Sequence, residues 1–113
     1  MYHVYVIGFE SAGFLKAMAL TGPLRVLKAE AKALPGHRAT KTFKAGSYHF
    51  VTFIWSEAAA LRSFTASAAV SGFENTAHRA TRFQQSYAFV CETAPSKDEM
   101  INLWRAARHA AAA

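Results

Sequence analysis

Four short segments combine β-branched and aromatic residues in the pattern typical of β-strands. The predicted strands are residues 2–9, 37–44, 48–55 and 82–91. The segment 48–55 is the most apolar, and it is apolar on both faces. Phe50 and Ile54 lie on one face, and Phe53 and Trp55 on the other, because strand side chains alternate with a period of two. A strand of this kind needs cover on both sides of its sheet.

Apolar residues spaced three or four apart predict helices between these strands. A short helix is expected within residues 11–20, anchored by Phe14, Leu15 and Met18. A second helix is expected to begin with Pro23 at its first position and to stop before Pro35-Gly36. Its apolar stripe consists of Leu24, Leu27, Ala31 and Leu34. Arg25, Lys28 and Lys32 lie off that stripe and are interpreted as a solvated face.

A third helix is expected after Ser56, which would serve as its N-cap, and a break is expected at Ser71-Gly72. Residues 73–80 would form a short helical piece or a loop. The apolar stripe of the third helix would be Leu61, Phe64 and Ala68. The spacing of Ser96 and Glu99 matches a capping box and predicts a C-terminal helix with Met100, Trp104 and Ala107 on one side. The alanine tail 110–113 is expected to fray.

The resulting order is β-α-β-β-α-β with one added helix, the ferredoxin-like arrangement. We therefore predict an α+β fold with an antiparallel sheet and a single domain over residues 1–113. Helices on one side leave aromatic residues uncovered on the other side, and monomers seldom expose such a patch. A second copy of the chain is the simplest cover, so we predict a homodimer. A small ligand would then occupy a cavity between the paired sheets or between helices and sheet.

The stretch from Trp55-Ser56-Glu57 through Leu61 and Phe64 to Ser67 resembles the strand-to-helix segment of dimeric α/β-barrel proteins. The Leu34-Pro35-Gly36 helix end is similar to the corresponding helix end in the same superfamily. With the matching order of elements, the resemblance covers residues 2 to about 92. It points to two branches, the antibiotic-biosynthesis-monooxygenase-like proteins and the spheroidene-monooxygenase type, and leaves the choice between them open.

The resemblance implies a monooxygenase-like enzyme that is either cofactor-free or assisted by haem. It also implies that Trp55 lines the substrate cavity. The position four residues before this Trp, where the family has a cavity Asn, is Val51 in this chain. The alternative interpretation of Trp55 is a core residue, since large aromatic side chains are usually buried. Some barrel families also hold a haem-binding or cavity His near the position of His78.

Five histidines occur along the chain, and none forms a pair with metal-ligand spacing. We therefore predict no metal site. His3 and His49 lie on the candidate cavity faces of their strands, where an imidazole could transfer a proton near neutral pH. A lone histidine is more often structural, so both interpretations stay open.

The chain carries 13 Lys and Arg against 7 Asp and Glu, a formal net charge of +6. The basic residues are scattered, which disfavours a nucleic-acid partner and leaves attraction for an anionic small molecule. No apolar run is long enough to cross a membrane. The single cysteine, Cys91, excludes an internal disulfide, and with no signal peptide expected we predict a cytoplasmic protein.

These observations yield two functional hypotheses. The first is a monooxygenase-like enzyme acting on a small hydrophobic or aromatic substrate, with His49 and Trp55 as catalytic candidates. The substrate-binding candidates would be His3, Tyr5, Phe53 and Tyr87. The second is a non-catalytic dimeric module that binds a small ligand in the same cavity or fills the cavity with side chains.

Overall fold

A four-stranded antiparallel sheet forms the centre of the computed structural model, which describes residues 1–112 apart from the side chains of Phe14 and Leu15. Its strands are β1 (Tyr2–Ser11), β2 (His37–Ala45), β3 (Tyr48–Trp55) and β4 (Thr81–Cys91). They are arranged in the order β2-β3-β1-β4. This order places the first strand in the centre between the third and fourth strands, which confirms the predicted ferredoxin-like α+β fold.

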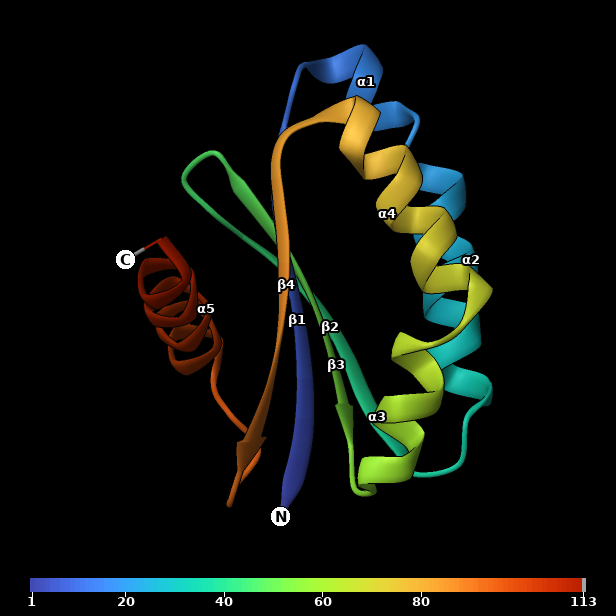
Figure 1. Ribbon diagram of the computed structural model, residues 1–113, viewed down its shortest axis with the longest axis vertical. Helices are drawn as coiled ribbons and strands as arrows, with labels where there is room; N and C mark the ends of the chain where they lie inside the picture. The colour runs from blue at the N-terminus through green and yellow to red at the C-terminus, as the bar shows by residue number, and fades with distance from the viewer. Residues whose placement is uncertain (113) are drawn as a thin grey trace.

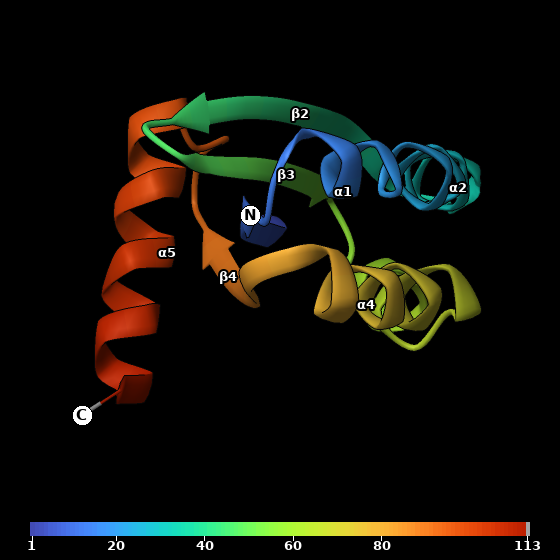
Figure 2. The ribbon, with the colours of Figure 1, turned by 90° about the horizontal axis from the view of Figure 1, so that it is seen from above.

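The sheet lies between two helical layers, as Figure 1 shows. One layer contains α2 (Thr21–Ala33), α3 (Ala58–Thr65) and α4 (Ala68–Ala80), with the short α1 (Phe14–Met18) at the upper end. The opposite layer is the single helix α5 (Lys97–Ala112), the added C-terminal helix. Seen from above, α5 crosses the sheet on the side away from α2 and α4 (Figure 2).

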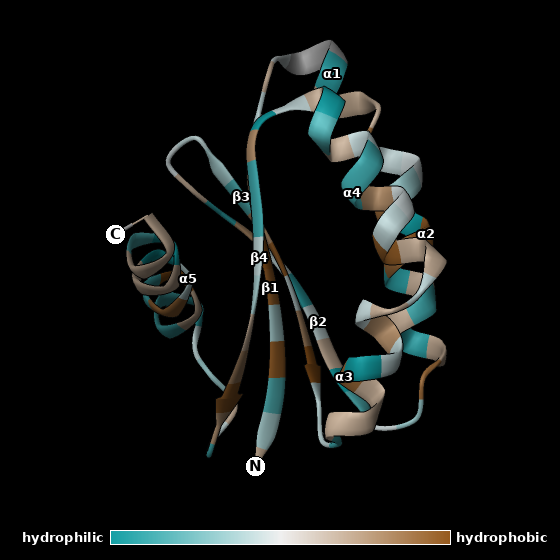
Figure 3. Cartoon of the chain, viewed as in Figure 1, coloured by the Kyte–Doolittle hydropathy of each residue, from teal (hydrophilic) through white to brown (hydrophobic). Residues whose placement is uncertain are grey.

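The larger core lies between the sheet and the first helical layer. It contains the odd-numbered side chains of β1 and β3, which meet residues from α2, α3 and α4. The main members are Tyr5, Ile7, Phe9, Leu27, Val51, Phe53, Trp55, Phe64 and Phe73. In Figure 3 the strands carry hydrophobic segments, and hydrophobic and hydrophilic segments alternate along the helices, as in amphipathic helices.

A second core lies under α5. Trp104 is 1% exposed and packs edge-on against Phe50, with ring centroids 5.1 Å apart. Its indole N–H donates a hydrogen bond to the carbonyl of Gln85 at 3.0 Å. Gly8 has no side chain at the point where the indole lies against β1, and a Cβ there would come within 2.6 Å of Cζ2 of Trp104. The close approach of helix and strand therefore depends on this glycine.

Arg108 holds the C-terminal end of α5 over the same face. Its guanidinium carbon lies 3.9 Å from the ring centroid of Phe83 and 5.4 Å from that of Tyr48. It also donates a hydrogen bond to the Tyr48 hydroxyl at 2.9 Å. The aromatic residues that the sequence analysis assigned to a dimer contact are thus covered in part by the chain's own C-terminal helix.

Several predicted helix boundaries were wrong. The helix after β3 ends at Thr65, and Ser67 caps the next helix by accepting a hydrogen bond from the backbone N–H of Val70. That next helix continues through Ser71-Gly72, because Val70, Phe73 and Ala77 form one buried face that outweighs the local preference for a break.

The predicted caps and anchors had mixed outcomes. Ser56 does not cap α3, and its hydroxyl instead lies 3.4 Å from the carbonyl of Gly36. Pro23 is the third residue of α2 rather than the first. Met18 is 57% exposed and does not anchor α1, while the predicted anchors Phe14 and Leu15 lie outside the described side chains.

The C-terminal helix begins as predicted. Ser96 and Glu99 exchange two hydrogen bonds of 3.2 Å each, which is the capping box. Residues 110–112 are helical instead of frayed, and residue 113 lies outside the described residues. None of the helices in the described part of the chain is both long and apolar enough to span a membrane.

Candidate functional site

The register of the sheet separates the predicted site residues into groups. His3 pairs with Trp55, whereas Phe9 pairs with His49 at the other end of β1 and β3. His49 and Trp55 share a face, but they are six positions apart along the strand, which is a distance of about 20 Å. The two catalytic candidates therefore lie at opposite ends of the helix-covered face and cannot both contact one small substrate.

Trp55 occupies the core, and none of its surface is exposed. Its ring lies 5.9 Å from Phe53 and 4.9 Å from Phe64, and His37 packs edge-on against it at 6.2 Å. The indole N–H has no hydrogen-bond partner among the described residues. Trp55 thus fills the position at which the family resemblance implied a cavity wall.

Tyr5 and Phe53 lie in the middle of the same face and pair with each other across β1 and β3. Both are buried, and both contact Phe64 of α3, with centroid distances of 6.1 and 4.7 Å. Burial raises the pKa of the Tyr5 hydroxyl, so the phenol remains protonated at neutral pH. Val51 is also buried, which makes the family's Asn position a packing position in this chain.

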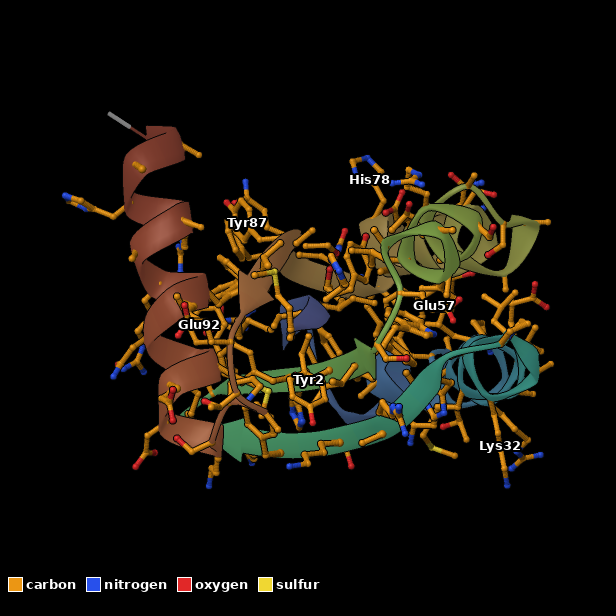
Figure 4. All side chains as sticks on the ribbon, turned by 90° about the horizontal axis from the view of Figure 1, so that it is seen from below. Tyr2, Lys32, Glu57, His78, Tyr87 and Glu92 are labelled. Atoms are coloured by element: carbon orange, nitrogen blue, oxygen red, sulfur yellow. The ribbon has the colours of Figure 1, made fainter. Side chains whose placement is uncertain are left out.

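Tyr87 lies on the opposite face of the sheet. It packs among the residues under α5, with its ring 6.3 Å from Trp104, and its hydroxyl donates a hydrogen bond to the side-chain carbonyl of Gln85. Figure 4 shows Tyr87 on the α5 side, while Lys32, Glu57 and His78 lie on the side of the other helices. The sheet therefore separates Tyr87 from the other candidates, and grouping it with Trp55 and His49 was wrong.

The end of the sheet that carries His49 has an open pocket of about 390 Å³. Phe9 and His49 form its sheet side, and their rings are stacked with centroids 5.4 Å apart and planes 16° from parallel. Leu20 and Leu24 add apolar surface from the start of α2 and the residue before it. The described residues that line it are Phe9, Ala17, Leu20, Thr21, Leu24, Arg25, Lys28 and His49. This volume lies within the range of small-molecule sites.

Two effects lower the pKa of His49: first its partial burial, then the positive charge of Lys44. The ordinary pKa of histidine is already below 7, so a lowered value keeps the imidazole neutral at physiological pH. A neutral imidazole can accept a proton from a bound molecule. His49 is therefore the predicted site residue whose position and protonation state suit acid–base chemistry in a pocket.

A second pocket of about 320 Å³ shares His49 and extends toward the β2–β3 turn. Its charged lining residues are Glu10, Lys44 and Arg82. The carboxylate of Glu10 accepts a hydrogen bond from the hydroxyl of Ser47 at 2.6 Å. The two pockets together surround His49 with four cationic side chains and one carboxylate.

Helix α2 contributes to this pocket, which was not predicted from the sequence. Thr21, Leu24, Arg25 and Lys28 have the spacing of one helix face. Arg25 and Lys28 were predicted to lie on a solvated face, but in the structure they line the pocket next to Leu24 of the apolar stripe. Helical spacing contained the signal, but only the tertiary structure shows that this face borders His49.

The resemblance implied a haem-binding or cavity histidine near the position of His78. His78 is exposed near the end of α4 and borders a pocket of only about 160 Å³. Within residues 1–112, no three His, Cys, Asp or Glu side chains gather closely enough to hold a metal ion.

No protein-family model matches this sequence, and no curated protein matches it significantly. Solved structures do match its fold. SnoaB, a cofactor-independent oxygenase from Streptomyces nogalater, aligns with a TM-score of 0.67 and 12% identity over 85% of this chain and 98% of its own. An antibiotic biosynthesis monooxygenase aligns with a TM-score of 0.64 and 14% identity over 84% of this chain and 100% of its own.

A dimeric ferredoxin-like protein of unknown function from Jannaschia sp. CCS1 also matches, with a TM-score of 0.67 and 12% identity. The alignment covers 80% of this chain and 100% of the Jannaschia protein. These structures agree with the antibiotic-biosynthesis-monooxygenase-like branch of the resemblance. At identities this low they establish the architecture: the chain has the ferredoxin-like fold shared by the antibiotic-biosynthesis-monooxygenase-like proteins.

Proposed function

We propose that this protein is a monooxygenase-like enzyme that binds a small hydrophobic or aromatic substrate in the pocket beside His49 and needs no cofactor. The observation that carries the proposal is a neutral histidine in the wall of a pocket with an apolar floor. The fold that the chain shares with a cofactor-independent oxygenase supports the same reaction class. A reducing, cytoplasmic location is part of the proposal.

The chemistry needs a substrate that can itself donate electrons to O₂. His49 would remove a proton from an activated C–H or O–H group of an electron-rich aromatic molecule, and the resulting anion would reduce O₂. For a methylene group the balanced outcome is R₂CH₂ + O₂ → R₂C=O + H₂O. The pocket would hold the ring system on Phe9, Leu20 and Leu24 and orient it toward the imidazole.

The test is oxygen uptake by the purified protein with a panel of electron-rich phenols, naphthols and aryl ketones. We expect uptake above the uncatalysed rate and at least about a 100-fold loss in the His49→Gln variant. His109→Gln is the matched control, because His109 is exposed on α5 and outside the pocket. Equal rates for His49→Gln and the unaltered protein would contradict the proposal, and a Soret band in the purified protein would contradict its cofactor-free part.

A second candidate function is ligand binding without turnover. Val51 replaces the family's cavity Asn, and Trp55 is packed into the core, so two of the family's cavity positions are structural in this chain. Measurable ligand binding with no oxygen uptake across the panel would favour this candidate.

We also propose that the protein is a homodimer, supported by the dimeric Jannaschia neighbour. The half-buried aromatic residues beside α5, which include Phe83 and Phe89, provide apolar surface for such a contact. Light scattering at micromolar concentration should give twice the chain mass of 12.4 kDa. A particle of 12.4 kDa at all concentrations would show that α5 alone covers this face.

A further inference from the structure

The pocket at His49 combines an apolar floor with a cationic rim. Phe9 and Leu20 are 6% and 3% exposed, so the floor is built from well-packed core residues. Arg25 and Lys28 lie on the α2 side of the same pocket, and none of the described residues that line it is acidic. This arrangement suits a ligand with one apolar part and one negatively charged part.

The surrounding charges strengthen the positive potential at this end of the sheet. Lys44 and Arg82 line the adjoining pocket and outnumber its one carboxylate, Glu10, which accepts a hydrogen bond from Ser47. Charges of one sign that line a concave surface attract the opposite charge. The basic residues that give the chain its net charge of +6 are scattered along the sequence. In the structure, some of them come together around the pocket where a ligand can bind.

We propose that the pocket selects a small amphipathic anion: a planar apolar body that rests on Phe9, Leu20 and Leu24 and a carboxylate that is held by Arg25 and Lys28. The guanidinium of Arg25 can donate two parallel hydrogen bonds to a carboxylate, and the Lys28 ammonium adds a second positive charge. The inference rests on the site of the proposed function and assigns its substrate class. It does not depend on whether the bound molecule is oxidised.

The test is a binding titration with three probes of the same shape. 2-Naphthoate carries the anion, 2-naphthamide is its neutral counterpart, and naphthalen-2-ylmethylammonium carries a positive charge. We expect 2-naphthoate to bind at least 10-fold more tightly than the amide, and the ammonium probe to bind most weakly. Raising the salt concentration should weaken the naphthoate complex and leave the amide complex nearly unchanged.

Variants of α2 then locate the anion. Arg25→Gln with Lys28→Gln should weaken 2-naphthoate at least 10-fold and leave the affinity for 2-naphthamide within about 2-fold. Lys32→Gln is the matched control, because Lys32 is exposed on the same helix and does not line the pocket. A thermal melt of each variant verifies that the protein is folded.

Each result bears on one proposal. Three results would overturn the carboxylate assignment. They are equal affinity for the three probes, equal losses of affinity for the double variant and Lys32→Gln, and no binding of 2-naphthoate at millimolar concentration. Tight naphthoate binding that depends on Arg25 and Lys28 supports it even if the oxygen-uptake panel shows no turnover. Turnover of neutral substrates with no preference for anions would support the proposed function and overturn this inference.

Discussion

Gly8 gives the most direct test of whether α5 packs on the sheet in solution. In Gly8→Ala, the new Cβ would lie 2.6 Å from Cζ2 and 2.8 Å from Nε1 of Trp104, so the indole must move. The movement would disturb the 3.0 Å hydrogen bond to Gln85 and the edge-on contact with Phe50.

The size of the effect follows from three contributions. Overpacking costs about 1–3 kcal/mol, and the weakened hydrogen bond costs about 1 kcal/mol. Removing a glycine from a strand returns about 0.5–1 kcal/mol, because the unfolded chain becomes less flexible. We therefore expect a net loss of about 1–3 kcal/mol, which lowers the Tm of a chain of this length by about 4–12 °C.

The matched control is Gly72→Ala. Gly72 lies inside α4, and apart from its chain neighbours and the backbone of its own helix no described atom is within 4 Å of its would-be Cβ, so the same substitution should stabilise the protein by about 0.5–1 kcal/mol. Thermal melts followed by circular dichroism would measure both variants. If Gly8→Ala also raised the Tm, the indole could not rest against β1 in solution, and the account of the face under α5 would be refuted.

Two further predictions concern the helix-covered face. Trp55→Ala should lower the free energy of unfolding by about 3–5 kcal/mol, measured by denaturant titration, because it removes a fully buried ring; an unchanged stability would show that Trp55 is not in the core. The pKa values of His37 and His49 are lowered chiefly by burial, so the native state takes up fewer protons than the unfolded state just below the ordinary histidine pKa of about 6.5. Stability should therefore fall as the pH drops below about 6.5, and replacing both histidines by Gln should flatten this part of the pH profile; an unaltered profile would contradict the assignment.

Features encoded by neighbouring residues were predictable. The strand Tyr48–Trp55 was predicted to the residue, because its apolar run begins after a turn and ends at the polar residues Ser56-Glu57 that precede α3. The capping box of Ser96 and Glu99 was also correct, because both partners lie within one helical turn. Gly72 was misread as a break because its local preference yields to the burial of residues on both sides of it along α4.

The candidate site was harder to predict because it depends on register and on contacts between distant segments. Alternation along one strand correctly placed His49 and Trp55 on the same face. Strand geometry alone, however, separates them by about 20 Å, which is too far for one small substrate to contact both. The face of Tyr87 depends on how β4 aligns with β1, and the cationic rim depends on where α2 packs. Neither arrangement can be derived from local spacing.

The position of α5 has a consequence for any partner that would bind the same face. Because α5 follows β4 after the short connection 92–96, it acts as a tethered ligand with an effective concentration in the millimolar range. A second molecule that must displace Trp104 from this face competes against that concentration. Suppose that a free partner binds the uncovered face with a dissociation constant of about 1 µM. Its apparent dissociation constant is then this value divided by the fraction of molecules in which α5 has left the face. Removing the helix would therefore act as a switch on intermolecular affinity, with no change to the sheet itself.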